Sequence, residues 1–572
     1  MKSLSCCSWL LVVALATGCS AETRGRPGDG GVRSDGMVYG CDNRTDTDGD
    51  GIADAVEGTS GASDDRDGDG IPDAEEARSG NPCAPADSDG DGTPDFLDTD
   101  SDNDGLTDGR ERDEGTDPTR TDTDGDGVTD LGEVEGSHTD PTDPASTIPE
   151  GDFFVVLPYN GDRAERRLRF GTDIKIADVF LLVDMTGSMG AERRNLIDGL
   201  LGVIIPGIQA EIPDVQFGVG GFDDYPYGGF GADCTVLDII GTGNGPRCDT
   251  PFYLLRGIAP PEEDVGGWSL TASASVCPID TTVRNIGHIE GSANGRPDIL
   301  EAVEGLPCHY GADASESYGP ALWATATGMG LTWPTGSVPG RTCPTIPDET
   351  TPRVGYPCFR PGALPIVLIF GDNTFHNGPG GASPYSFPAP TFDEVVAALN
   401  GIGARVVGVN SGGARPNFEE VARQTGAVRA DMTPLVFDIS GDGSGLDTTV
   451  VSAVAELVGG TPQDVTTRTE NVPGNPDDFD ATRFIKSIVP FEGYTPGGAP
   501  GGYGSKDMTT FYAVIPGTTV EFTIDFWNDV RPPADVAQIF KATIIVVGNG
   551  VTDLDSRNVY IIVPPEGGTI LI

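Results

Sequence analysis

Three oxygen-bearing side chains follow a short apolar segment at two-residue spacing: Asp184, Thr186 and Ser188. The segment before them, 179–183, is almost wholly apolar, which predicts a fully buried strand. Open α/β sheets place their ligands in loops at the carboxyl ends of parallel strands. One carboxylate and two hydroxyls are hard oxygen donors, which suit Mg2+, Ca2+ or Mn2+. The alternative is a strand-to-helix turn in which Ser188 is the N-cap.

A second apolar segment, 364–370, is also followed by an aspartate, Asp372. Parallel strands end at one edge of a sheet, so Asp184 and Asp372 are expected to converge there. Asp223 and Asp224 follow a third strand; they could reach the same metal, but capping of their own loop is the simpler interpretation. The remaining pattern alternates between helix and strand, which predicts a doubly wound α/β domain. The expected helices are 191–210, 321–329, 392–399, 418–424 and 448–457, and the further strands are 215–219 and 404–409.

The stretch 178–460 resembles a von Willebrand factor type A domain, with Asp184-x-Thr186-x-Ser188 as its metal-ion-dependent adhesion site. The details are similar to the integrin β-subunit version. Phe370-Gly-Asp372-Asn-Thr-Phe375-His376 is similar to that family's aspartate-bearing strand end, and Asp313 and Glu316 match an Asp and a metal-binding Glu before a helix. The resemblance implies that one Mg2+ or Ca2+ is held, in part through water, by Asp184, Thr186, Ser188, Glu316 and Asp372.

Two departures from that family concern the flanking metal sites. The acidic pair that holds an adjacent calcium in integrins is reduced here to Ala191-Glu192, and an Asn two residues before Asp313 is replaced by Gly311. The resemblance therefore does not extend to flanking ions. The Gly- and Pro-rich insertion 226–310 is expected on the metal face, held by disulfides.

One acidic pattern, Asp-x-Asp-x-Asp-Gly-x-x-Asp-x-x-Glu or a close variant, occurs five times between residues 46 and 133. Carboxylates at positions 1, 3, 5, 9 and 12 with glycine at position 6 match the spacing of EF-hand calcium loops. Glycine is needed there because the chain must turn tightly enough to bring both ends of the loop to one ion. The predicted calcium ligands are, copy by copy, Asp46, Asp48, Asp50, Asp54 and Glu57; Asp65, Asp67, Asp69, Asp73 and Glu76; Asp87, Asp89, Asp91, Asp95 and Asp98; Asp100, Asp102, Asp104, Asp108 and Glu111; and Asp122, Asp124, Asp126, Asp130 and Glu133.

The helices that flank EF-hands are not expected, because the third and fourth copies nearly abut and prolines recur among the copies. Residues 46–145 instead resemble thrombospondin type 3 repeats, in which calcium ions form the core of an extended rod. This stalk has almost no apolar core, so we expect it to melt without calcium. The alternative is a disordered acidic tail, which would need no glycine at a fixed offset.

Residues 1–19 are typical of an export signal, with Lys2, an apolar run over 9–16 and small residues before Cys19. They resemble a bacterial lipoprotein signal, in which Cys19 carries the lipid, so an outer-membrane or cell-surface location is expected. Ordinary secretion is the alternative. Residues 20–45 are predicted to be a flexible linker. No other segment is long enough to span a bilayer, so the lipid would be the only tie to a membrane.

The cysteines support export. Of 11 cysteines, three lie within residues 1–19, and the even number that remains predicts up to four disulfides. Cys41 and Cys83 flank the first acidic loops, but the pairing is left open. The disulfide candidates are Cys41, Cys83, Cys234, Cys248, Cys277, Cys308, Cys343 and Cys358.

The C-terminal residues 475–572 contain short runs rich in Val, Ile, Phe and Thr between Gly and Pro turns, which predicts a β-sandwich. Two further strands in 150–177 cannot be stable alone, and their partners are expected at the far end of the chain. The A-like domain would then be inserted into the sandwich or followed by it.

The formal net charge of −54 over 572 residues excludes a nucleic-acid partner by repulsion. We expect a non-enzymatic surface protein that recognises a carboxylate of a protein or extracellular-matrix ligand through a divalent cation. The alternative is a structural envelope protein whose metals serve stability only. An enzyme is not predicted, because no nucleophile–base pair occurs and His376, the only nearby histidine, is expected to pack or to hydrogen bond within its loop.

Overall fold

The computed structural model describes residues 45–57, 65–231, 249–261, 275–276, 284–285, 298–306, 313–380, 383–565 and 570, apart from positions 48, 79, 348, 350 and 535. The predicted signal, the linker, Asp48, Cys19, Cys41, Cys234, Cys248, Cys277 and Cys308 lie outside these residues, as does the side chain of Glu57. The chain divides into two compact units, one running to Thr147 and one from Ile148 to Glu566. In the described part of the chain, no helix has the length and apolar character needed to cross a membrane.

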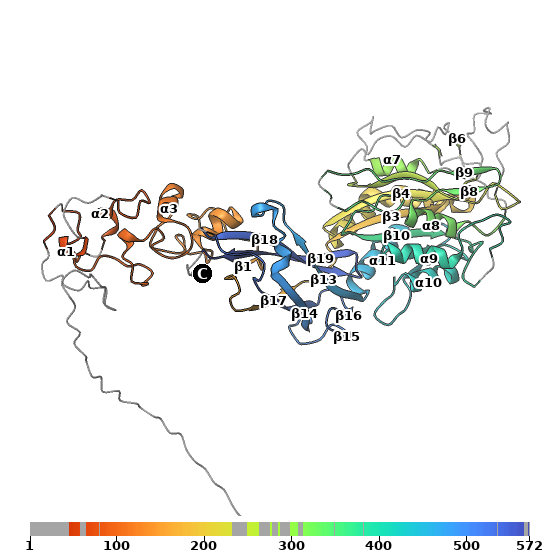
Figure 1. The fold of residues 1–572 in the computed structure, drawn as a ribbon. Coiled ribbons are helices and arrows are strands. Elements are labelled where there is room, and N and C mark those ends of the chain that lie inside the picture. The colour runs from red at the N-terminus through yellow and green to blue at the C-terminus, as the bar shows by residue number, and fades with distance from the viewer. Residues whose placement is uncertain are drawn as a thin grey trace, which may run out of the picture. The chain divides into compact units, whose positions relative to one another are not determined.

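The first unit consists of acidic loops joined by short helical turns (Figure 1). Among the described residues the loops are not flanked by long EF-hand helices; instead, a helical turn of three to seven residues begins at position 9 in four of the copies. The turns remain short, since a glycine or proline soon follows most of them. They are α1 (Asp54–Glu57), α2 (Asp73–Glu76), the 3-10 turn η1 (Asp95–Leu97), α3 (Asp108–Glu114) and, in the fifth copy, the π-helical turn η2 (Gly132–Ser137).

Each loop is closed by its own carboxylates. In the fourth copy, the position-9 Asp108 accepts hydrogen bonds from the backbone nitrogen (2.7 Å) and hydroxyl (2.6 Å) of Ser101, and Asp104 accepts one from Leu106 N (2.7 Å). The position-6 glycines have φ between 98° and 102°, which a side chain would make costly. The unit has little apolar core, as expected: Ile52, Ala77 and Phe96 form one small buried cluster.

The second unit contains a six-stranded sheet of order β12-β11-β10-β3-β4-β5, with all neighbours parallel except the edge strand β5. Its central strands are nearly all apolar because both faces are covered, as in doubly wound folds. The strands are β3 (Ile176–Asp184), β4 (Asp214–Phe222), β5 (Tyr253–Ala259), β10 (Leu364–Gly371), β11 (Arg405–Asn410) and β12 (Val436–Asp438).

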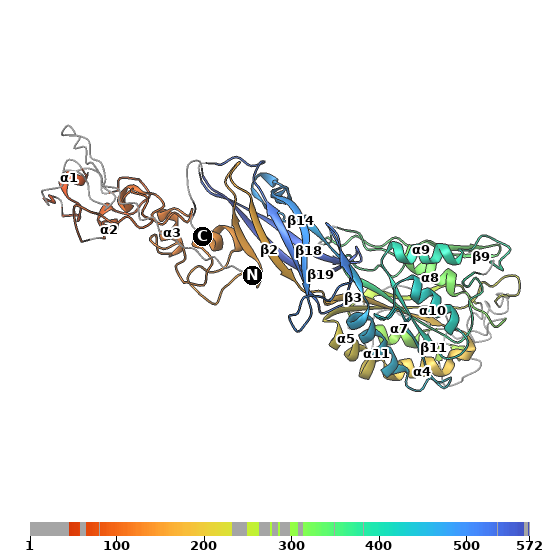
Figure 2. The same ribbon diagram turned by 90° about the horizontal axis from the view of Figure 1, so that it is seen from below.

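Helices lie on both faces of this sheet (Figure 2). One group is α4 (Gly190–Gly199), α5 (Ile205–Glu211), α7 (Asp298–Glu304) and α11 (Leu446–Gly460), and the other is α8 (Tyr318–Thr327), α9 (Phe392–Gly401) and α10 (Arg415–Gln424). The helix expected over 191–210 is continuous, with a π-helical segment, η4 (Leu200–Ile204), between α4 and α5. Pro206 lies in the first turn of α5 and has no N–H to donate to the ladder, which accounts for the local change in hydrogen-bond register.

Two further sheets are built from both ends of the second unit. One has the order β1-β19-β18-β13-β16-β15 and the other β14-β17-β2. They contact each other through aromatic rings, such as Phe153 with Phe526 (5.9 Å between centroids) and Phe511 with Phe522 (5.3 Å). The strands are β1 (Phe153–Val156), β2 (Ala164–Phe170), β13 (Gln463–Asn471), β14 (Ile485–Tyr494), β15 (Ser505–Lys506), β16 (Phe511–Val514), β17 (Thr519–Phe526), β18 (Gln538–Gly548) and β19 (Thr552–Val563).

The order of the strands along the chain shows that the parallel sheet is inserted between the strands of the other two sheets. Strands β1 and β2 belong to different sheets, β1 pairing in parallel with β19 and β2 antiparallel with β17. The polar residues of β13 hide the strand pattern, so this strand lies outside the range 475–572 predicted for the sandwich. A 3-10 turn, η6 (Ala481–Phe484), precedes β14. Two short hairpins, β6 (Ser275–Val276) with β7 (Arg284–Asn285) and β8 (Leu331–Trp333) with β9 (Gly336–Val338), complete the described strands.

The described cysteines are all oxidised. Cys343 and Cys358 form a disulfide within the 331–361 loop. Cys83 is also disulfide-bonded.

Candidate metal centre

The strand register brings the predicted aspartates to one rim of the parallel sheet. Asp184 is paired with Phe222 at the end of β4, and Val183 is paired with Phe370 at the end of β10. Asp372 therefore follows one strand end while Asp223 follows the other, on either side of Asp184. The backbone ties these ends together, since Met185 N donates to Phe222 O (2.9 Å).

The Asp184 loop is preorganised by its own hydroxyl. Thr186 donates to Asp184 Oδ1 from its backbone nitrogen (2.9 Å) and from Oγ1 (2.6 Å), and its Oγ1 lies 3.2 Å from Ser188 Oγ. Asp184 and Thr186 are buried, whereas Ser188 is exposed. Ser188 does not cap the helix through its side chain, because the N-cap position of α4 is Met189 and has no side-chain hydrogen bond.

Tyr318, which sequence reasoning missed, connects the two aspartate loops. Its hydroxyl donates to Asp184 Oδ2 (3.0 Å) and accepts from the backbone nitrogen of Asn373 (3.4 Å), the residue after Asp372. Its ring is fully buried and stacks on Phe375 (4.5 Å between centroids). Nothing in the sequence distinguishes this tyrosine from an ordinary core residue at the start of a helix.

Glu316 is held at the same rim by its backbone. Its nitrogen donates to Thr374 O (3.0 Å) and its carbonyl accepts from His376 N (3.1 Å), so residues 315–317 run beside the loop that follows β10. The next residue, Ser317, donates from its nitrogen to Asp223 O (3.2 Å). The Glu316 side chain is buried, and its Oε2 has no hydrogen-bond partner within the part of the chain that the structure describes.

The electrostatics show how close these carboxylates are. Burial raises the pKa of Glu316, and the charges of Asp184 and Asp224 raise it further. Burial likewise raises the pKa of Asp184, against the hydrogen bond from Thr186 and with the Asp372 charge adding to the rise. Buried carboxylates that repel one another and leave an oxygen without a donor fit a cation. All the donors are hard oxygens, which suits Mg2+ or Ca2+.

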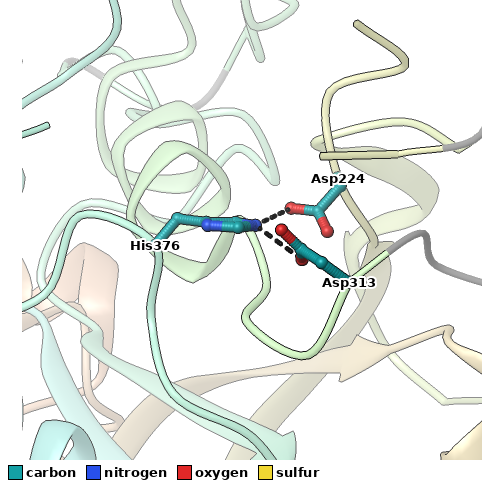
Figure 3. Close-up of side chains that lie close together, drawn as sticks. All are labelled: Asp224, Asp313 and His376. Carbon is teal, nitrogen blue, oxygen red and sulfur yellow. Dashed lines mark ion pairs between the residues drawn. The ribbon is translucent and has the colours of Figure 1, made fainter. Parts of the chain in front are cut away.

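A histidine lies beside this group, between two carboxylates (Figure 3). His376 Nε2 forms ion pairs of 3.2 Å with Asp224 Oδ1 and with Asp313 Oδ1. Ser317 Oγ also donates to Asp224 Oδ1 (2.8 Å). Burial lowers the pKa of His376, but the hydrogen bonds and charges of Asp224 and Asp313 outweigh it and raise the pKa above 6.5.

The structure thus brings all five predicted shell residues to one rim, with Ser188 at its exposed side and Asp372 half-buried. It also places Asp223, Asp224 and Tyr318 at this rim. Asp223 and Asp224 had a signal in the sequence, because they form an acidic pair after a predicted strand, but Tyr318 had none. Asp224 does more than cap its loop, because its side chain contacts His376 and Ser317 from other segments. Glu192 is buried nearby; burial, opposed in part by hydrogen bonds that include one from Ser411, raises its pKa, and the Asp372 charge adds to the rise.

The first unit holds a second set of buried oxygens. Burial of the position-12 residue raises the pKa of Glu76 to about 9 and that of Glu111 to about 10, with neighbouring aspartates adding to the effect. Neither oxygen of Glu76 has a hydrogen-bond partner among the described residues. These orphaned carboxylate oxygens fit the calcium ions that the loop spacing predicts.

Comparison with known proteins identifies part of this unit. Residues 46–61, 65–80, 100–121 and 122–144 match the family model of the bacterial TSP3 repeat. The N-terminal region carries bacterial TSP3 repeats. This confirms the predicted thrombospondin type 3-like repeats, although the third predicted copy, 87–98, lies outside the matched segments.

Two of the solved structures that are similar to the chain illustrate the likeness. A von Willebrand factor type A protein from Catenulispora acidiphila is 14% identical, over 72% of this chain and 72% of that one, with a TM-score of 0.26. The pilus adhesin SpaC from Lactobacillus rhamnosus GG, in an open conformation, is 13% identical, over 70% of this chain and 45% of that one, with a TM-score of 0.23. No curated protein sequence matches the chain.

Proposed function

We propose that this protein is a non-enzymatic surface adhesin that recognises a carboxylate of a protein ligand through a divalent cation at the Asp184 rim. The observation that carries the proposal is the convergence of Asp184, Glu316 and Asp372 at one edge of a parallel sheet, with a buried Glu316 oxygen that no group of the described chain satisfies.

The residues of this site have distinct tasks. Asp184, Thr186 and Ser188 offer oxygens from one loop, and Glu316 and Asp372 offer carboxylates from two others. Tyr318 and the Thr186 nitrogen hold the Asp184 carboxylate in place without contributing charge. A Mg2+ or Ca2+ bound here would supply a coordination position that a partner's Asp or Glu can take in place of water.

The rest of the chain is proposed to present this site. Strands β1, β2 and β13–β19 form a β-sandwich into which an A-like domain, running from β3 to α11, is inserted. Residues 46–145 form a calcium-stiffened stalk, supported by the repeat match and by the orphaned oxygens of its position-12 glutamates. Export through the predicted signal, with lipid attachment at Cys19, would place the site outside the cytoplasm, on the outer membrane or the cell surface.

The test is retention on surfaces that carry short peptides with a single Asp, compared with the same peptides carrying Asn. We expect the full chain to be retained on the Asp surface in Mg2+ or Mn2+ and to be released by a chelator. Asp184→Asn should abolish retention, whereas Asp393→Asn, an exposed change on α9, should not alter it.

Two results would contradict the proposal. Equal retention of wild type on the Asp and Asn surfaces would exclude carboxylate recognition. Loss of cation binding by Asp184→Asn without any retention of wild type on either surface would favour the alternative of a structural envelope protein whose metals serve stability only.

A further inference from the structure

A cavity of about 260 Å3 lies in the second unit, outside the predicted metal shell. Its walls come from helix α8, strand β8, the segment that precedes α9 and the first turn of α9. Pockets for drug-sized ligands measure about 300–1,000 Å3, so this cavity has room for one or two side chains of a partner. We call it the Trp323 cavity, and its lining residues include Tyr225, Trp323, Leu331, Pro388, Pro390 and Glu394.

Tyr225 forms the floor of the Trp323 cavity, because it lines the cavity although it is 0% exposed. Its hydroxyl is buried and has no hydrogen-bond partner among the described residues. Burial raises the pKa of Tyr225, so the hydroxyl keeps its proton and can donate. A buried hydroxyl without a partner is unfavourable, and an acceptor in the cavity would remove that cost.

Trp333 supplies a second buried donor beside Tyr225. The two rings lie edge to face, with 5.6 Å between their centroids. Within the described part of the chain, Trp333 Nε1 has no hydrogen-bond partner, and an indole nitrogen can only donate. The hairpin turn holds this indole in place, because Gly336 packs directly against it and Thr335 Oγ1 donates to Pro226 O (3.4 Å). The floor therefore contains two donors that require an acceptor.

The walls of the cavity are apolar rings, and its mouth carries a carboxylate. Trp323 is half-buried and faces the cavity together with Pro388 and Pro390. Glu394 is exposed, and its Oε2 accepts from the backbone nitrogen (2.8 Å) and the hydroxyl (2.9 Å) of Thr391, which holds the carboxylate in place. These hydrogen bonds lower the pKa of Glu394, so the group is charged at neutral pH.

We propose that the Trp323 cavity binds a proline of an extended partner peptide, with a Lys or Arg of the same peptide beside Glu394. A peptide proline supplies an apolar ring for the walls and carbonyl oxygens for the Tyr225 and Trp333 donors. Its nitrogen carries no hydrogen that burial would leave unpaired. Proline-rich segments bind aromatic-lined grooves through the same features. A sugar would instead bring several hydroxyl donors to a floor that already holds two.

This site goes beyond the carboxylate recognition proposed above, because no cation takes part in it. It nevertheless adjoins the rim. Tyr225 directly follows Asp224, and its ring lies 4.9 Å from that of Tyr385. The Tyr385 hydroxyl lies 2.9 Å from Ser317 Oγ, which donates to Asp224. The floor of the cavity is therefore connected to the rim through Tyr385.

The experiment titrates the full chain, in chelator, with the amidated peptide acetyl-Lys-Ala-Pro-Pro-Ala and follows tryptophan emission. The peptide has no carboxylate, so recognition through a cation cannot contribute. We expect saturable binding, and no binding of the same peptide with alanine in place of both prolines. Tyr225→Phe should weaken binding about two- to tenfold, the range expected for one hydrogen bond. The urea midpoint of this variant should stay equal or rise, because the deleted hydroxyl had no partner in the described structure.

A second variant fills the cavity without removing a polar group. Ala389 lines the cavity, so Ala389→Leu should abolish binding of the proline peptide. The matched controls are Tyr159→Phe, after β1, and Ala397→Leu, on α9; both positions are exposed, and both variants should bind as wild type does. If Ala389→Leu does not fold, Tyr225→Phe decides the matter, since it keeps the shape of the ring.

Four results would overturn the proposal. Equal binding of the proline and alanine peptides would exclude recognition of proline, and unchanged binding by Tyr225→Phe would exclude its hydroxyl as a donor. Saturable binding of methyl glucoside without binding of the peptide would assign the cavity to a sugar. A folded wild type that binds neither probe would leave the cavity to water. Because the carboxylate-free peptide is measured in chelator, failure here is distinguishable from failure of the proposed adhesion function.

Discussion

Replacing Glu316 by glutamine should stabilise the metal-free second unit and weaken its metal binding at the same time. The side chain is 3% exposed, and burial together with the Asp184 and Asp224 charges raises its pKa above 4.5. In the folded, metal-free state this group holds a proton at pH values where the unfolded chain has released it. The contribution of this group to the free energy of unfolding is therefore fully present below about pH 4.5 and is lost as the pH rises above that value.

The gain in the free energy of unfolding cannot exceed the cost of protonating Glu316 at the pH of the measurement. At pH 7, placing a proton on a carboxylate whose unfolded pKa is 4.5 costs about 3.4 kcal/mol, at 1.36 kcal/mol for each pH unit. Glutamine has the same shape, carries no charge and can donate to Asp224. In chelator, Glu316→Gln should thus raise the free energy of unfolding by up to about 3 kcal/mol at pH 7 and by almost nothing at pH 4.5.

The assay is urea unfolding followed by tryptophan fluorescence, in chelator and in Mg2+, at both pH values. In Mg2+ the gain should shrink or reverse, because the variant has lost a predicted metal ligand. Glu456→Gln is the control: this residue is exposed and forms an ion pair with Arg429, and the change should cost less than about 1 kcal/mol. A Glu316→Gln gain that is equal at pH 4.5 and pH 7, or absent in chelator, would refute the reasoning.

Three further outcomes are expected. Tyr318→Phe, which removes the 3.0 Å hydrogen bond to Asp184, should weaken metal binding by about 1–2 kcal/mol in calorimetry while circular dichroism stays unchanged; equal affinity would contradict the positioning role. His376→Gln should lower the melting temperature more at pH 6 than at pH 9, since a raised histidine pKa stabilises the fold below about pH 6.5 and that gain is lost as the pH rises through the raised value. Chelator should expose the stalk, residues 46–145, to protease within minutes while the second unit stays intact, and resistance of the stalk would exclude calcium as its core.

Spacing along the chain determined the local chemistry of this protein. Carboxylates at fixed offsets with glycine at position 6 predicted the calcium loops, because such loops are built from consecutive residues. Apolar strands followed by Asp184 and Asp372 predicted the rim, because parallel strands end at one edge. The helix predicted over 191–210 is present throughout, with a π-helical segment before Pro206 that the apolar stripe did not predict. One expectation failed outright: the polar surface of β13 concealed a strand.

Only the tertiary structure decided which distant residues meet. Tyr318 touches Asp184 because helix α8 begins beneath the rim, and His376 lies between Asp224 and Asp313 because three separate loops converge there. Asp108 reaches Asp69 because Gly109 allows two repeat copies to approach closely. Contacts of this kind depend on how elements that are far apart in the sequence pack against one another. A local pattern of residues does not determine that packing.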